Sequence, residues 1–308
     1  MDGLAPAIVG PFEESVMDRS RRFYKMSGSG NDFIFFDEAD GPTDDFRNAA
    51  TIDSLCARGT GIGADGVVFF DRSDSAAIRI AYFNSDGSVG ELCGNATLCT
   101  VRLAEILGTP MDGDLLIKTD SGQVTGRLVD GVPEIDLEPV KHVSTDWAEI
   151  PPIAPERRVG YASVGVPHIA IAVPDTEAVD VLGRGSQVRH HKSLVRGANA
   201  NFLAPAADGR WTIRTYERGV EAETLACGTG AVASAILLVS WGQTEQPVRL
   251  VTRSGRELTV TLRRGGGVWR PSLRGSAELV FTGELPTPEP EDTESLRSPL
   301  QNPSRPRG

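Results

Sequence analysis

The sequence predicts an α+β protein of two pseudo-symmetric, strand-rich domains, each formed by a curled mixed sheet around one central helix. Short strand-like runs dominate and helical patterns are few, which argues against a repeating βαβ fold. A cysteine followed by glycine and a long apolar run occurs at Cys93 and again at Cys227, which indicates an internal duplication. The chain of 308 residues is long enough for two domains of about 100–150 residues each.

The predicted strands are short runs rich in β-branched and aromatic residues. Several alternate apolar and polar residues, and turn signals such as Asp86-Gly87 and Asp130-Gly131 separate them. In chain order they are FIFFD, GVVFF, IRIAYF, LLIKT, PEIDL, HIAIAV, WTIRTY, VRLVT, ELTVTL and AELVF. Helices are predicted for the two segments that follow Cys93 and Cys227, and for a third segment at 46–57.

The two ends of the chain differ from its middle. Residues 1–20 show no periodicity and are expected to form a flexible extension, and residues 286–308 are rich in Pro and charge, as in a disordered tail. The first domain is predicted to comprise residues 21–141 together with 275–285. The second is predicted to comprise residues 142–274.

Composition limits the functions that the chain can have. A net charge of -11 argues against nucleic-acid partners, because phosphate binding needs clustered Lys and Arg. No apolar stretch approaches the roughly 20 residues that span a bilayer, and no export signal is evident. Four cysteines are too few for a disulfide scaffold. We therefore expect a cytoplasmic protein with reduced thiols and no membrane partner.

The repeated cysteines suggest acid–base chemistry. A thiol at a helix start lies near unpaired backbone N–H groups and the positive end of the helix dipole, so we expect its pKa to be lowered. If the two halves face each other, both sulfurs meet in one cleft. Cys56 and Cys99 have no such setting and are interpreted as buried small residues. No Cys and His have the spacing of a zinc site, so no metal is predicted.

A glycine-rich segment at 61–66 matches the GxGxxG pattern of dinucleotide-binding proteins. It follows a predicted helix and precedes a strand, which reverses the strand, loop and helix order that the pattern requires. A tight turn is the better interpretation, and no cofactor is predicted.

Five motifs together resemble the signature of the diaminopimelate epimerase family. In chain order they are KMSGSGNDF, GTGIGADG, YFNSDGSVGELCGN, GANANF and YERGVEAETLACGTG. The resemblance covers residues 23–285. It implies a pyridoxal-phosphate-independent isomerase that interconverts LL- and meso-2,6-diaminopimelate, for lysine and peptidoglycan synthesis, and it leaves open whether the protein is a homodimer.

The resemblance also implies the site. Cys93 and Cys227 are the expected catalytic pair, since inversion of an α-carbon needs a base on one face and an acid on the other. Substrate contacts are expected from side chains and from backbone N–H groups, namely Asn31, Asn84, Gly94, Asn95, Asn199, Glu217, Arg218, Gly228 and Thr229. His168 also occupies a family position, where a structural role is as well supported as a catalytic one.

One departure from the family pattern keeps alternatives open. Where better-known members read GNPH with a substrate-contacting Asn, this chain has Val166, which lacks a side-chain hydrogen bond. Another racemase of the same fold, acting on a different amino acid, is therefore the nearest alternative. From a different class, the thiols could form a redox switch or a metal-binding module, although no C-x-x-C motif supports this.

Overall fold

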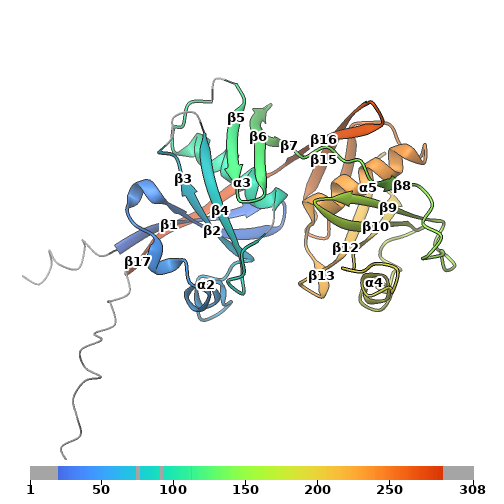
Figure 1. The fold of residues 1–308 in the computed structure, drawn as a ribbon, viewed down its shortest axis with the longest axis horizontal. Coiled ribbons are helices and arrows are strands. Elements are labelled where there is room, and N and C mark those ends of the chain that lie inside the picture. Colours follow the sequence, from blue (N-terminus) through green and yellow to red (C-terminus); the bar gives the residue numbers. More distant parts are fainter. Residues whose placement is uncertain (1–19, 74–76, 91–92, 112, 287–308) are drawn as a thin grey trace, which may run out of the picture.

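The computed structural model describes residues 20–73, 77–90, 93–111 and 113–286. Figure 1 shows two lobes side by side, one formed by the first part of the chain and the other by the second. Across the described residues, 17 strands form one continuous hydrogen-bonded network. None of the described helices is long and apolar enough to cross a membrane.

The first lobe contains eight strands and two α-helices. Its strands are β1 (Ser20–Gly28), β2 (Asn31–Asp37), β3 (Gly66–Asp71), β4 (Ile78–Asn84), β5 (Leu115–Thr119), β6 (Gly122–Val129), β7 (Val132–Asp136) and β17 (Ala277–Pro286). Its helices are α2 (Ala49–Cys56) and α3 (Gly94–Ile106), with 3-10 turns η1 (Glu38–Asp40) and η2 (Asp44–Phe46).

The second lobe is built from the remaining elements. Its strands are β8 (Val143–Ser144), β9 (Arg158–Val164), β10 (Val166–Ala172), β11 (Asn199–Pro205), β12 (Trp211–Glu217), β13 (Ala222–Thr224), β14 (Val248–Val251), β15 (Glu257–Gly265) and β16 (Val268–Gly275). Its helices are α4 (Val181–Arg189) and α5 (Gly228–Ser240).

The strand pairings of the two lobes correspond one to one. In the first lobe β2 is parallel to β3 across α2, and β4 is parallel to β5 across α3. In the second lobe β10 is parallel to β11 across α4, and β12 is parallel to β14 across α5. The antiparallel pairs β1–β2, β3–β4 and β5–β6 match β9–β10, β11–β12 and β14–β15. The predicted fold class, two pseudo-symmetric mixed sheets, is confirmed.

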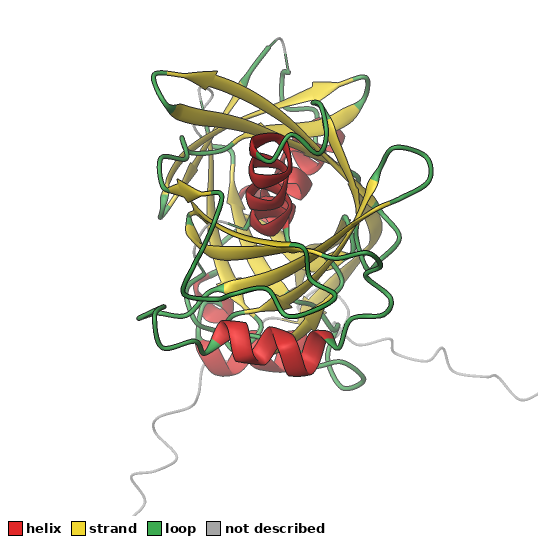
Figure 2. Ribbon diagram, turned by 90° about the vertical axis from the view of Figure 1, so that its right-hand side faces the viewer, coloured by secondary structure: helices red, strands yellow, loops and turns green. Residues whose placement is uncertain are grey.

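Each lobe curls its sheet around one helix that is buried on nearly every side. Ten of the thirteen residues of α3 and ten of the thirteen of α5 are buried. Figure 2 shows helical turns enclosed by strands in the end-on view, with another helix on the outside. A largely apolar helix must be covered by other elements over most of its surface, so the two cysteine-led segments become the central helices and fix where the cysteines lie.

Strands β16 and β17 connect the lobes. Strand β16 pairs with β15 in the second lobe and with β7 in the first. The chain then enters β17, which pairs with β1 from Ser20 opposite Pro286 to Gly28 opposite Ala277. Apart from Ser20 and Pro286, the predicted N-terminal extension and C-terminal tail lie outside the described residues.

The local predictions missed one helix and seven strands, namely β1, β6, β8, β9, β11, β13 and β16. All ten predicted runs lie in strands, and the helix predicted at 46–57 is α2. Helix α4 was missed, because its sequence VLGRGSQVR contains two glycines and lacks an apolar stripe. The duplication was the signal that could have found it, since α4 occupies the position of α2. The glycine-rich segment at 61–66 lies between α2 and β3, as predicted for a turn.

Gly28 packs against the central helix of the first lobe. A Cβ atom at Gly28 would lie 2.7 Å from the backbone oxygen of Asn95 and 2.8 Å from Sγ of Cys99. The first atom belongs to the backbone of α3 and the second to a fully buried side chain, so Gly28→Ala is expected to destabilise the fold by about 1–3 kcal/mol. Urea unfolding measures this, with Gly265→Ala as the control because its added Cβ would meet nothing closer than 3.8 Å. Equal unfolding midpoints for Gly28→Ala and wild type would contradict this packing.

Candidate active site

The central helices of the two lobes begin at the same place. Cys93 and Cys227 are their N-cap residues, both in extended backbone conformation. A Cβ built on Gly94 would lie 3.8 Å from Cα of Gly228, and both glycines approach the side chain of Leu273 on β16. The two helix starts, which contain Gly94, Asn95, Gly228 and Thr229, therefore lie close together.

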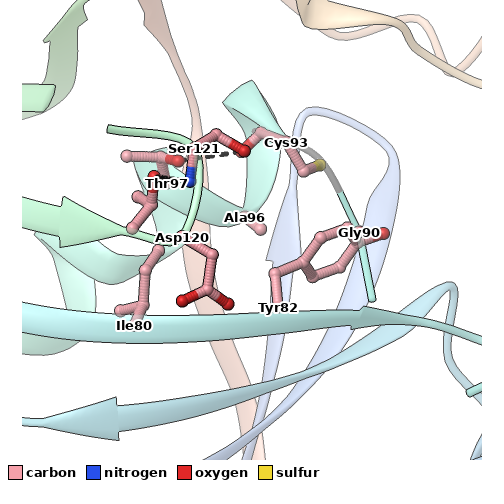
Figure 3. A pocket seen from close by; sticks show the side chains of 9 residues that line it. Ile80, Tyr82, Gly90, Cys93, Ala96, Thr97, Asp120 and Ser121 are labelled. Atoms are coloured by element: carbon pink, nitrogen blue, oxygen red, sulfur yellow. Dashed lines mark hydrogen bonds between the residues drawn. The ribbon is translucent and has the colours of Figure 1, made fainter. Parts of the chain in front are cut away.

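The two thiols have different surroundings. Cys227 is buried, and its Sγ accepts a hydrogen bond from the backbone N–H of Gly230 at 3.3 Å, with the hydroxyl of Thr229 at 3.6 Å. Cys93 is half-buried and makes no such cap hydrogen bond. Its neighbours instead form a small cavity, which Figure 3 shows with Cys93 beside Tyr82 and Gly90. The volume of about 10 Å³ admits one water molecule rather than an amino acid.

The acidity of the thiols differs from the sequence-based expectation. Burial raises the pKa of Cys93 to about 12, although the N–H groups of Ala96 and Asn95 oppose this rise. Burial also raises the pKa of Cys227 well above its ordinary value. The expected lowering at a helix start was therefore wrong in direction, because the loss of hydration outweighs the helix dipole. At neutral pH both thiols are therefore protonated.

A half-buried carboxylate lies near both thiols. Glu217 ends β12, and burial raises the pKa of this carboxyl, while the Thr224 hydroxyl opposes the rise. The charge of Glu217 in turn raises the pKa of Cys93 and of Cys227. The next residue is tied to β11, because the backbone N–H of Arg218 donates to Oδ1 of Asn199 at 2.7 Å. The structure thus brings Arg218 and Asn199 together next to Glu217, whose charge acts on both thiols.

His168 lies behind this group, fully buried on β10. Its ring nitrogens face the amide nitrogens of Asn199 at 3.5 Å and Asn201 at 3.4 Å. Burial and the charge of Arg218 lower the pKa of His168 to about 3, so the imidazole is neutral at physiological pH. Asn201 was not predicted from the sequence, although it stands two residues after Asn199 and therefore on the same face of the strand. The structural role of His168 is the one that this geometry supports.

On the first lobe, two predicted asparagines contact each other. Asn95 Nδ2 donates to Oδ1 of Asn31 at 2.6 Å, and Asn31 Nδ2 donates to Oδ2 of Asp65 at 2.8 Å. Asp65 was not predicted, because its glycine-rich segment was interpreted only as a turn. Its charge raises the pKa of Cys93, which places it in the same electrostatic environment as the thiols.

Two further residues complete the description. Asn84 pairs with Gly66 across β4 and β3, and its Nδ2 donates to the Ser88 hydroxyl at 3.0 Å within its own turn. Among the described residues, no contact with another predicted side chain connects Asn84 to the site. Val166 is half-buried, next to Gly165 at the turn between β9 and β10.

The remaining cysteines lie elsewhere. Cys56 and Cys99 are buried in the core, as predicted, and all four cysteines are free thiols. Within the described ranges, no three His, Cys, Asp or Glu side chains gather in an arrangement that could hold a metal ion.

Comparison with known proteins agrees with this description. A sequence model of the family described as diaminopimelate epimerase matches residues 23–142 and again 160–279. A diaminopimelate epimerase of Gemmatimonas aurantiaca is 43% identical over 273 residues, covering 85% of this chain and 98% of that protein. One from Aquifex aeolicus is 35% identical over 283 residues, covering 85% and 97%. A solved phenazine biosynthesis protein of the PhzF family from Bacillus anthracis superposes with a TM-score of 0.65 at 14% identity, covering 86% and 99%.

The repeated domain and the two helix starts that meet between the lobes define a class of isomerases with duplicated α+β domains. The family match covers both halves of the chain, in the same two segments that the strand pairings relate. This chain belongs to the diaminopimelate epimerase family.

Proposed function

We propose that this protein interconverts LL- and meso-2,6-diaminopimelate by moving a proton between Cys93 and Cys227, without a cofactor. The single observation that carries the proposal is the meeting of two cysteine-capped helix starts in a chain of this family. In one direction the thiolate of one cysteine removes the α-proton, and the thiol of the other returns a proton to the opposite face. The roles exchange in the reverse direction.

The helix starts also serve the substrate carboxylate. Removal of the α-proton places negative charge on the α-carboxylate, and the backbone N–H groups of Gly94, Asn95, Gly228 and Thr229 are positioned to stabilise that charge. Glu217 is proposed to bind the substrate ammonium, and Arg218 to bind a carboxylate. Asn31, Asn84 and Asn199 are proposed to complete the substrate contacts.

Because the pKa values of both thiols are raised, we infer that substrate binding helps to form the thiolate. An ammonium group close to the thiols favours the charged form, and it also neutralises Glu217, whose charge raises the pKa of both cysteines. We infer that the base forms when substrate binds, as one thiol releases its proton to solvent. Since the cavity beside Cys93 admits about one water, substrate entry is proposed to need movement of the lobes. The need for reduced thiols supports a cytoplasmic location.

Proton NMR in D₂O tests the function directly. The reduced protein with LL-diaminopimelate, and no added pyridoxal phosphate, is expected to lose the α-proton signal as the meso isomer appears. Glutamate and proline, supplied separately, serve as comparison substrates for the alternative racemase that Val166 leaves open. Rapid exchange of a comparison substrate, with LL-diaminopimelate unchanged, would replace the proposed substrate with another amino acid.

A further inference from the structure

Asp65 begins a chain of hydrogen bonds that ends between the two helix starts. Its Oδ1 accepts from Nη2 of Arg58 at 2.8 Å, and its Oδ2 accepts from Nδ2 of Asn31 at 2.8 Å. Oδ1 of Asn31 then accepts from Nδ2 of Asn95 at 2.6 Å. Arg58 also bonds Asp32 at 2.6 Å, which anchors the outer end of the chain.

The carboxylate sets the direction of every bond in this chain. A carboxylate only accepts hydrogen bonds, so Asn31 must turn its NH₂ group toward Asp65 and its oxygen toward Asn95. Asn95 must then turn its own NH₂ group toward Asn31. Its carbonyl oxygen consequently points the other way, and this orientation depends on Asp65 although the two residues do not touch.

The Asn95 oxygen lacks a partner and faces the site. Asn95 is only 2% exposed, and its Oδ1 has no hydrogen-bond partner among the described residues. It lies 3.5 Å from a Cβ built on Gly228, at the start of α5. A buried acceptor without a donor is costly, so a ligand that supplies an N–H group here gains affinity.

We propose that Asp65 is a positioning residue that, through Asn31, fixes the Asn95 carbonyl as an acceptor for the substrate's α-ammonium group. This rests on the proposed function, in which the α-carboxylate binds at the N–H groups of the same helix starts. The α-ammonium is bonded to the same carbon and so lies within reach. An ammonium group has three N–H donors, so Glu217 and Asn95 can bind it together.

Asp65→Asn tests the proposal because both oxygens of Asp65 accept hydrogen bonds. The NH₂ group of the new amide faces either Arg58, or Asn31 together with the backbone N–H of Asp32, which also donates to Oδ2 of Asp65 at 3.2 Å. Arg58 has donors only and stays bonded to Asp32, whereas Asn31 can rotate and accept, and the Asp32 N–H contact is the longest and weakest of the three. Rotation of Asn31 would reverse Asn95 and turn an N–H group toward the ammonium. We expect KM for LL-diaminopimelate to rise at least tenfold with kcat changed less than threefold.

Two further variants distinguish a change in the orientation of the Asn31 and Asn95 amides from a simple loss of negative charge. Asp32→Asn removes a carboxylate from the same arginine and from Lys25, which keeps its hydrogen bond to the Gly63 carbonyl, but it leaves the amide chain intact. Its KM is expected to stay within twofold of wild type. Asp65→Asn combined with Asn31→Asp restores an acceptor beside Asn95 and preserves the net charge, so Asn95 is expected to donate to residue 31 again in the crystal structure. This double variant is judged by structure and not by KM, because Asn31 is itself a proposed substrate contact. An equal rise in KM for Asp32→Asn and Asp65→Asn, or no rise in either, would overturn the proposal.

A crystal structure of ligand-free Asp65→Asn gives a readout that does not depend on turnover. Rotation of the amides leaves Arg58 within about 3.2 Å of residue 65, the upper limit of an N–H···O hydrogen bond. Displacement of Arg58 with the amides in place would overturn the inference. The proposed function is judged separately, since it fails if the wild-type protein does not exchange the α-proton of LL-diaminopimelate.

Discussion

Cys93→Ser and Cys227→Ser are each expected to lower kcat for epimerisation by about three orders of magnitude, within the 10²–10⁴ range of general acid–base catalysis. A serine hydroxyl is a far weaker acid than a thiol, so it can neither form the base nor donate the proton at a useful rate. Because inversion needs both groups, losing either one stops the reaction in both directions. Stopped assays that follow the LL to meso conversion, and the reverse, measure the effect.

The control for this prediction is a cysteine outside the site. Cys56 is buried at the end of α2 and is free, so Cys56→Ala removes a thiol without touching either helix start. Its kcat is expected to stay within twofold of wild type. Turnover close to wild type in either Cys93→Ser or Cys227→Ser would rule out the two-thiol mechanism, and would return the redox-switch interpretation to consideration.

Glu217→Gln is expected to lower kcat/KM by roughly thirtyfold to a thousandfold, which corresponds to about 2–4 kcal/mol for one lost partner of a buried charge pair. The amide keeps the shape of the side chain but loses the charge that binds the ammonium. Steady-state kinetics with LL-diaminopimelate measure the loss. Glu221→Gln is the matched control, because Glu221 lies in the adjacent turn but is exposed and paired with Arg189.

The same variant is expected to change the pH dependence. A negative charge disfavours the thiolate, so Glu217 raises the pKa of Cys93 and Cys227. Removing that charge lowers both pKa values, and the rising limb of kcat/KM against pH moves toward lower pH. An unchanged limb in Glu217→Gln would show that the carboxylate is neutral or distant when the base forms.

Much of this site could be predicted from local sequence. The segment after Cys227 is apolar on nearly all sides, and the segment after Cys93 is largely apolar apart from polar residues such as Arg102 and Glu105. Helices of this kind must be largely buried, which puts both N-cap cysteines at comparable places in the two halves. The ten runs were recognised as strands because they are short and rich in β-branched and aromatic residues, and several of them alternate apolar and polar residues, as a sheet with one buried face requires. The missed helix α4 has weak local propensity, so its helical conformation depends on packing against β11 and β12.

By itself, the sequence determined the duplicated fold, the cysteine pair and the family, because each is encoded in the types and order of neighbouring residues. Only the tertiary structure decided the protonation of the thiols, since desolvation depends on everything that surrounds a group and here reverses the effect of the helix dipole. Only the structure shows that Asp65 is connected to Asn95 through Asn31. The direction of such a hydrogen-bond chain depends on which donors and acceptors meet in space. Residues 65 and 95 are far apart in sequence, and no local pattern relates them.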